Sequence, residues 1–392
     1  MYRAKNGDAF LLAISAPKKI LTLIDGGYAS TFKNHISQDL TSLASQGYEL
    51  DLVVATHIDA DHITGLIEFF KDNGTSNFPE IIPVKNVWHN SLRSISSENS
   101  RADTSSSDLE LLKDIGYHGY PHSQECSPEE ISARQGSSLA AHLLEGGYHW
   151  NNSDGFTSIN SQNTAPLQLS DTVKIEAINP GSERLGSLKT WWLREVRKLG
   201  FAGSIENNRI FDDAFEFMCA RGQLSEDYGP DQISISSSRT LDEDYEKDIS
   251  ITNSSSIAFI VHIHSTKILF LGDAWSEDIE KELRIKNKGK NSMIFDAIKI
   301  SHHGSRHNTS VSLLNMIDSP AYFISTDGKR HSHPNISVLK AIVDRPSSFK
   351  RNLYFSYSTR ASKYMNDYKS KSGAAFTIHE NANDWISLGK RK

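Results

Sequence analysis

The sequence predicts an α/β protein in which two sheets lie between two outer layers of helices, a four-layer αββα sandwich. Apolar runs of strand length alternate with segments of helical spacing in both the first and the last part of the chain. The 392 residues are 38% hydrophobic and 23% charged, which is enough apolar surface to fill a core. Residues 183–250 break the alternation, and we expect them to form a mostly helical insertion within a single domain over 1–392.

The first quarter of the chain has the clearest alternation. A Pro-containing turn joins the first two expected strands, and Gly26 and Gly27 break the chain before the first expected helix. The expected strands are 8–15, 19–25, 52–55 and 84–88, and the expected helices are 30–45 and one that begins near Asp61.

Regular patterns are sparser in the middle and return near residue 256. Residues 91–131 are Ser-rich and are expected to be loop with one short helix. The expected strands are 167–169, 173–178, 256–264, 267–271, 296–300, 321–326, 352–358, 374–379 and 384–388. The expected helices are 137–144, 188–199 and 210–218, then 275–286, 309–317 and 335–343.

Composition excludes several classes of protein. There are 42 Lys and Arg against 48 Asp and Glu, and this balance of −6 argues against an indiscriminate polyanion binder. No apolar run approaches the roughly 20 residues of a membrane helix, and the N-terminus lacks the features of a signal peptide. Two cysteines, Cys126 and Cys219, exclude a disulfide framework and a four-Cys zinc site. We therefore expect a cytoplasmic protein with no membrane partner.

A short motif after the third expected strand carries most of the chemical information. Residues 56–62 read Thr-His-Ile-Asp-Ala-Asp-His, and a His-x-acid-x-acid-His string is expected by chance about 0.01 times in this chain. A tight turn after a buried strand fans the side chains outward, so His57 and Asp59 can face one cation, and Asp61 and His62 a second. Aspartates that cap a helix would explain Asp59 or Asp61 alone, but not the flanking histidines. We interpret the motif as a metal site.

Other residues that could bind a metal ion or a substrate follow the ends of other apolar strands. Asp25 is placed to accept a hydrogen bond from a ligand histidine, and Asp273, after a glycine, is placed to bridge two cations. The histidine pair His302 and His303 stands before a glycine at the end of a further strand. The polar residues that follow these ends are Ser305, Arg306, His331 and His333.

The order of these motifs resembles the metallo-β-lactamase superfamily. Strand–Asp-Gly, His-x-Asp-x-Asp-His, Gly-Asp, Ser-His-His-Gly-Ser and His-Pro follow one another along the chain. More narrowly, they resemble the hydrolase domain of the ComEC-type DNA-uptake proteins and their free-standing relatives. The similarity spans about 5–90, 165–180 and 253–345. It implies the four-layer sandwich that is typical of the superfamily.

The resemblance also implies a centre of two divalent ions. It implies that the two halves of the 56–62 motif each hold one ion, that Asp273 bridges the ions, and that one residue of the pair 302–303 completes the second site. We favour His302, because it comes first after its strand.

Two departures from the superfamily pattern bear on the metal. Asp59 stands where the superfamily usually has a histidine, and the stretch 252–256 reads Thr-Asn-Ser-Ser-Ser where another histidine is usual. Asn253 is at most a weak ligand or a substrate contact. Because carboxylate in place of imidazole makes the site richer in oxygen, Mn²⁺ is favoured, although Zn²⁺ also binds mixed His and Asp sites.

We expect a metal-dependent hydrolase that uses a metal-bound hydroxide, and most of all a phosphodiesterase or nuclease that acts on nucleic acid or nucleotides. Asp61 would bind a metal ion and orient the hydroxide. By resemblance, His333 fits best as the group that stabilises the departing oxygen, with His331 and Arg306 as alternatives, and Ser305 is a further candidate for substrate contact.

Two other functions stay open. The same hydroxide could hydrolyse carboxylic esters or amides, such as a lactone or a lactam. The chain could instead be a non-catalytic metal-binding module whose segment 183–250 binds a protein partner.

Overall fold

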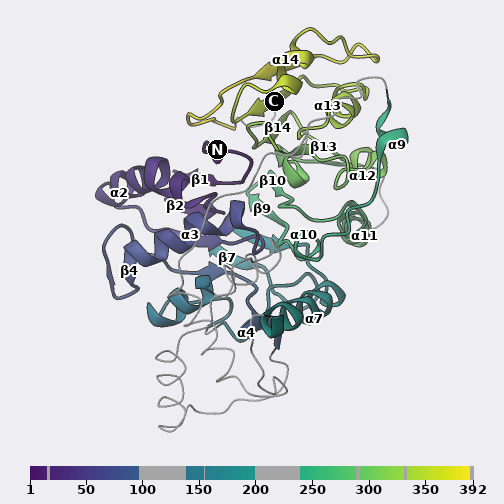
Figure 1. Cartoon of the computed structure of the whole chain (residues 1–392). Helices are drawn as coiled ribbons and strands as arrows, with labels where there is room; N and C mark the ends of the chain where they lie inside the picture. Colours follow the sequence, from purple (N-terminus) through teal and green to yellow (C-terminus); the bar gives the residue numbers. More distant parts are fainter. Residues whose placement is uncertain are drawn as a thin grey trace. The chain divides into compact units, whose positions relative to one another are not determined.

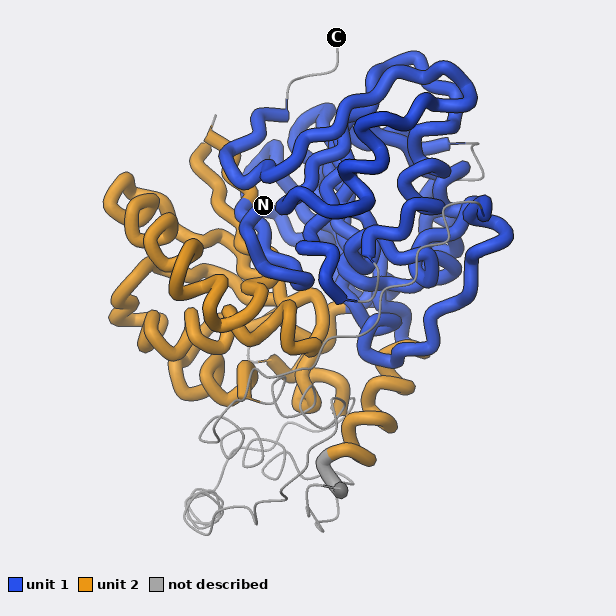
Figure 2. The backbone as a smooth tube through the Cα atoms, turned by 45° about the horizontal axis from the view of Figure 1, so that its top comes forward, with its two compact units in different colours: residues 1–11, 160–182, 228–392 blue, residues 12–159, 183–227 orange. Residues whose placement is uncertain are grey.

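The structure is a computed structural model, and it describes residues 1–15, 18–96, 138–153, 155–198, 239–287, 292–330 and 333–388. The chain divides into two compact units (Figure 2). Unit 1 comprises Met1–Leu11, Asn160–Ser182 and Tyr228–Lys392, and unit 2 comprises Leu12–Ile159 and Glu183–Asp227. Both units mix helices and strands, which confirms the α/β class. The four-layer arrangement and the single domain with an insertion over 183–250 stay predictions.

A four-stranded sheet lies mainly in unit 2, with only the start of its first strand in unit 1 (Figure 1). Its order is β1 (Phe10–Ile14), β2 (Ile20–Ile24), β3 (Leu50–Val54) and β6 (Val87–Trp88). β2 runs parallel to β3, and β3 runs parallel to β6. Every residue of β2 and β3 is buried, which explains why both are mostly apolar in the sequence, interrupted only by Thr22 and Asp51.

Most of the helices of unit 2 follow from the expected pattern. The helix predicted over 30–45 is one helical stretch with a π-helical turn in it. Its segments are α1 (Ala29–Thr31), η1 (Phe32–Ile36) and α2 (Ser37–Ser45). The other elements are α3 (Ala60–Asn73), α4 (Leu92–Ser96), a helix over 138–145, α7 (Ser182–Lys198) and the hairpin of β4 (Gly74–Thr75) and β5 (Phe78–Pro79). The helix predicted over 210–218 lies outside the described residues.

Two glycines let α3 touch the loop that follows β2. A Cβ on Gly65 would lie 2.0 Å from the carbonyl oxygen of Gly26, so only glycine fits at this position of the helix. Two backbone hydrogen bonds hold the contact: Gly26 N donates to His62 O over 2.8 Å, and Gly65 N donates to Gly27 O over 2.8 Å. The first turn of α3 is thereby fixed against the end of β2.

An eight-stranded sheet forms the centre of unit 1. The order is β16 (Phe376–His379), β15 (Arg351–Phe355), β14 (Ala321–Ile324), β12 (Ala297–Lys299), β10 (Thr266–Phe270), β9 (Phe259–Ile263), β8 (Val173–Ala177) and β7 (Leu167–Ser170). The strands from β10 to β16 run parallel to their neighbours, whereas β7 to β10 pair antiparallel. The carboxyl ends of β10, β12 and β14 therefore share one edge of the sheet.

Helices and short turns connect these strands. They are α9 (Leu241–Asp244), α10 (Ile251–Ser254), α11 (Ser276–Lys286), the 3-10 turn η2 (Ser301–Gly304), α12 (Val311–Met316), α13 (Ile336–Val343) and α14 (Arg360–Asn366), with a two-stranded pair of β11 (Met293–Ile294) and β13 (Ile317–Asp318). The strand predicted over 384–388 is wrong: no strand forms there, and Trp385 is 62% exposed.

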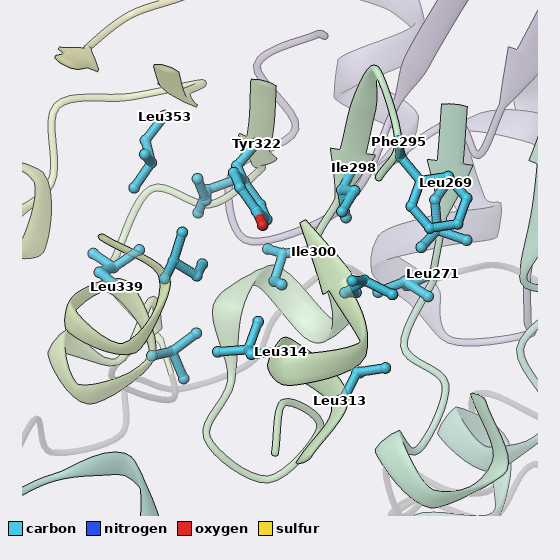
Figure 3. Close-up of a cluster of buried hydrophobic side chains, with 14 of the residues drawn as sticks. Leu269, Leu271, Phe295, Ile298, Ile300, Leu313, Leu314, Tyr322, Leu339 and Leu353 are labelled. Carbon is cyan, nitrogen blue, oxygen red and sulfur yellow. The ribbon is translucent and has the colours of Figure 1, made fainter. Parts of the chain in front are cut away.

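The core of unit 1 lies between this sheet and three helices. Ile298 and Tyr322 of neighbouring strands pack with Leu313 of α12 and Leu339 of α13, as Figure 3 shows, and Ile279 of α11 belongs to the same buried cluster. All five side chains are buried. Burial of such side chains stabilises the fold by about 1.5–3 kcal/mol each. The cluster supports the strands β10 and β12, which are followed by the candidate metal ligands Asp273, His302 and His303.

A partly buried ion cluster holds the beginning of β15. Asp318 accepts hydrogen bonds from Arg351 Nε over 2.9 Å and from Arg351 Nη2 over 2.6 Å. Arg345 Nη2 also donates to this carboxylate over 3.2 Å, and so does the Tyr322 hydroxyl over 2.9 Å. Arg351 is fully buried, so this carboxylate compensates a charge that has no access to water.

A half-buried ion pair links β8, β9 and α11. Glu176 accepts from Lys286 Nζ over 2.7 Å and lies 3.1 Å from His262 Nε2. The hydrogen bond from His262, together with the one from Lys286, lowers the pKa of Glu176 to about 2, against the effect of burial.

Candidate metal centre

The motif of residues 56–62 lies in unit 2, in the turn between β3 and α3, at the carboxyl ends of the parallel strands β2 and β3. Asp59 occupies the N-cap position of α3 in an extended conformation, with φ −72° and ψ 145°, but its side chain makes no capping hydrogen bond. Its Oδ2 instead lies 3.5 Å from Nε2 of His57. The capping alternative for Asp59 is therefore not supported, and the carboxylate is turned toward an imidazole.

His57 and His62 lie close together in this turn. Both are buried, and their ring centroids are 4.1 Å apart with an angle of 51° between the planes. A ring nitrogen of each lies within 4.8 Å of one on the other, and a carboxylate oxygen of Asp61 lies within 4.8 Å of a ring nitrogen of His62. Imidazole and carboxylate are the donors that Zn²⁺ and Mn²⁺ bind, so this donor set fits a divalent ion.

Asp25 orients one of these histidines. It follows β2 with φ 53°, a left-handed conformation, and its Oδ2 lies 2.9 Å from His62 Nδ1. Thr56 holds the same carboxylate, because its backbone N–H donates over 2.7 Å and its hydroxyl donates over 2.7 Å. With Nδ1 of His62 donating to Asp25, its Nε2 is left as the ligand atom. The structure thus brings Asp25 and His62 together, and their role at a metal stays a prediction.

A second donor set lies at the sheet edge of unit 1. β10 and β12 are parallel neighbours, with Phe270 paired with Lys299. Asp273 follows β10, and His302 and His303 follow β12. Each of these three offers a ligand atom within 4.8 Å of the other two, and Nε2 of His302 and of His303 lies 3.7 Å and 3.8 Å from Asp273 Oδ2.

The histidine pair has an unusual backbone. His302 has φ 44° and ψ 56°, and His303 has φ 54° and ψ 21°. Two successive non-glycine residues in the left-handed region cost about 1–3 kcal/mol each. The turn is held by His302 N, which donates to Gly272 O over 3.0 Å, and by Ser305 N, which donates to His302 O over 2.8 Å. As a result, both rings present Nε2 to the same carboxylate.

Asp8 and Lys299, which the sequence analysis missed, contact the donor set of Asp273, His302 and His303. The Nδ1 of His303 donates to Ser325 O over 2.7 Å and lies 3.2 Å from Asp8 Oδ1. Lys299 forms an ion pair with Asp8, donates to Gly272 O over 3.0 Å and lies 3.6 Å from Asp273 Oδ1. Lys299 is 2% exposed, so its ammonium is buried among carboxylates. The only signal in the sequence was a lysine within an apolar strand.

The pKa values of the two histidines of this set shift in opposite directions. Burial lowers the pKa of His302, which keeps the ring neutral and its Nε2 lone pair available. Burial acts on His303 in the same direction, but the charges of Asp8 and Asp273 outweigh it and raise the pKa of His303. A cation bound at Nε2 would compete with that proton.

Of the remaining predicted residues of unit 1, His333 lies against His302. The His333 ring is buried and packs edge-on against His302, with centroids 4.9 Å apart. Arg306 donates from Nη1 to Asp244 over 2.6 Å, so its charge is matched by a carboxylate. The Ser305 hydroxyl accepts from the backbone of the turn, and Asn253 donates to Asp248 over 2.7 Å. His331 lies outside the described residues.

Comparison with known proteins supports the hydrolase interpretation at a coarse level. No curated protein matches the chain significantly. In the described part of the chain, no helix combines the length and the apolar character needed to cross a membrane. The narrower resemblance to ComEC-type hydrolases stays a prediction. Residues 3–123, which include the His57 motif, match the family model of the metallo-beta-lactamase superfamily, whose members are generally metal-dependent hydrolases.

Proposed function

We propose that the protein is a metal-dependent phosphodiesterase or nuclease that acts on nucleic acid or nucleotides with two divalent ions, Mn²⁺ or Zn²⁺. The observation that carries the proposal is that each unit gathers buried histidines and aspartates at the carboxyl edge of its sheet. In this proposal, each donor set supplies ligands for divalent ions.

The oxygen content of the donors favours a phosphate substrate. Asp59, Asp61 and Asp273 offer carboxylates beside four histidines, and oxygen-rich sites suit ions that also bind phosphate oxygens. The chain as a whole carries a charge of −6, so a polyanionic substrate needs local positive charge. When bound, such ions lower the pKa of a coordinated water and neutralise charge on the phosphate in the transition state.

The side chains have distinct roles in this proposal. Asp61 binds a cation and accepts a hydrogen bond from the attacking water. Asp25 and the Asp8–Lys299 pair hold the rings of His62 and His303 in place. His333, beside His302, donates a proton to the departing oxygen.

The substitution Asp61→Asn tests the proposed reaction. Purified protein with Mn²⁺ or Zn²⁺ is assayed on bis-(p-nitrophenyl) phosphate and on single- and double-stranded DNA and RNA. Wild type is expected to cleave at least one of these substrates and D61N none. Asp39→Asn is the matched control, because it makes the same chemical change at an exposed position of α2 and should retain full activity.

The leaving group tests the role of His333. His333→Gln is expected to slow cleavage of a dinucleotide by about 10²–10⁴-fold, because its alkoxide leaving group needs a proton. Cleavage of bis-(p-nitrophenyl) phosphate should change little, since p-nitrophenolate leaves without protonation. Equal loss on both substrates would contradict a role as general acid.

The same assays separate the alternatives. Hydrolysis of nitrocefin or a chromogenic lactone, without phosphodiester cleavage, would indicate an ester or amide hydrolase. Full metal occupancy with no turnover on any substrate, and a stable complex in pull-down experiments, would indicate a non-catalytic module with a protein partner. Either result would overturn the proposal.

A further inference from the structure

A buried network of amides reaches His302 from the side opposite its proposed ligand atom. The Nδ1 of His302 lies 2.8 Å from Oδ1 of Asn308. Asn308 also donates from Nδ2 to Asp248 Oδ2 over 2.7 Å and to the backbone carbonyl of Asp273 over 2.9 Å. Asn308 is fully buried. This single side chain joins three other residues of unit 1: His302, Asp248 and Asp273.

The network determines which way the Asn308 amide points. Its Nδ2 faces two acceptors, a carboxylate oxygen of Asp248 and the carbonyl oxygen of Asp273, and neither can donate a hydrogen bond. The other end of the amide, Oδ1, must therefore face His302. Asn308 Oδ1, which accepts only, lies 2.8 Å from Nδ1 of His302, closer than the donor Nδ2 of Asn253 at 3.4 Å. The shorter contact therefore places the proton on Nδ1 and leaves the lone pair on Nε2. This Nε2 is the atom that faces Asp273 Oδ2 at 3.7 Å.

The carboxylate of Asp248 is held firmly behind the amide. Its Oδ1 accepts from Ser250 N over 2.8 Å, and its Oδ2 accepts from Asn253 Nδ2 over 2.7 Å as well as from Asn308. Asn253, expected from the sequence to be a weak ligand or a substrate contact, thus holds this carboxylate. The negative charge polarises the Asn308 amide and strengthens its oxygen as an acceptor.

We propose that Asn308, with Asp248 behind it, is a positioning residue that fixes His302 in the tautomer able to bind a metal ion. The inference rests on the proposed function, in which His302 is a ligand. It assigns a role to the described end of the predicted insertion, because Asp248 lies within 183–250. Partners of this kind set the affinity of a metal site by orienting the ligand ring and raising its basicity.

Metal affinity measured in a double-mutant cycle tests this role. Zn²⁺ binding is measured on the full chain by competition with a chromogenic chelator for wild type, N308L, H302A and the double variant N308L/H302A. N308L keeps the branched shape of the native side chain but cannot accept from His302. We expect N308L to bind Zn²⁺ about 10–100-fold more weakly than wild type, and the double variant to bind like H302A alone.

Two controls separate positioning from packing. Asn73→Leu makes the same change at another fully buried asparagine, which bonds to Tyr148 and to the backbone at Ile82 in unit 2, and it should leave Zn²⁺ affinity unchanged. Circular dichroism and thermal unfolding without metal check the fold. If N308L does not fold, D248N replaces it, with a smaller loss expected in wild type and no further loss in the H302A background.

The outcomes are distinct. Wild-type affinity in N308L, or a further loss when N308L is added to H302A, would overturn the inference and leave the proposed function standing. A wild-type protein that binds no Zn²⁺ or Mn²⁺ would overturn the proposed function and this inference together.

Discussion

Replacing Lys299 with methionine should destabilise the metal-free protein strongly and the metal-loaded protein less. The Lys299 ammonium is 2% exposed, pairs with Asp8, lies 3.6 Å from Asp273 Oδ1 and donates to Gly272 O. Its removal leaves two buried carboxylates without this cation, which costs about 3–5 kcal/mol. For a domain of this size that is a fall of roughly 10 °C in the melting temperature.

A bound divalent ion would supply the charge that Asp273 loses. The penalty measured in excess Zn²⁺ should therefore be smaller than the penalty in EDTA. Thermal unfolding of wild type and K299M, each in EDTA and in excess Zn²⁺, gives the comparison. Lys267→Met is the matched control, because it makes the same change at an exposed position of the neighbouring strand β10. It should change the free energy of unfolding by no more than about 0.5 kcal/mol. An unchanged melting temperature of K299M in EDTA would refute the buried ion pair. An equal loss with and without metal would refute the link to a metal at Asp273.

Three further predictions concern the scaffold. Asp318→Asn should cost about 3–5 kcal/mol in urea unfolding, because it leaves two guanidinium groups opposite a neutral amide, and a cost below about 1 kcal/mol would contradict this reasoning. Glu176 has its pKa lowered to about 2 in the folded protein, so its contribution, about 1 kcal/mol for a partly exposed pair, is full above the unfolded value near 4.5 and is lost as the pH falls toward about 2. The stability difference between wild type and Glu176→Gln should shrink over that range, and a difference independent of pH would contradict it. Gly65→Ala should cost about 1–3 kcal/mol or more from its contact with a backbone carbonyl, whereas Gly186→Ala in α7, with no atom within 4 Å of the added Cβ, should stabilise by about 0.5–1 kcal/mol; losses of equal size would contradict the close approach.

The sequence predicted the elements whose residues are buried on both sides. β2 and β3 are mostly apolar because every residue in them is buried. The helix α14 escaped prediction because Ala361, Ser362 and Met365 are its only buried residues, too few to set a clear period, although a capping box at Thr359 marks its start.

The candidate site was predictable where its residues are neighbours in the chain or follow strand ends. The His57 motif and the pair at 302–303 belong to this class, because the ends of parallel strands meet at one edge. Asp8, Lys299 and Asn308 were missed because they act through contacts between distant segments, which single-sequence patterns do not encode. The left-handed backbone of His302 and His303 was equally hidden, since no glycine occupies those two positions.

The central claim is that the donors of the two units hold divalent ions. Crystals grown with Mn²⁺ or Zn²⁺ and measured on both sides of the metal absorption edge would locate these ions directly. We expect anomalous peaks about 2.0–2.4 Å from side-chain atoms of His57, His62, Asp273 and His302. Ordered ions bound only elsewhere, or no peak beside these side chains in catalytically active protein, would contradict the claim.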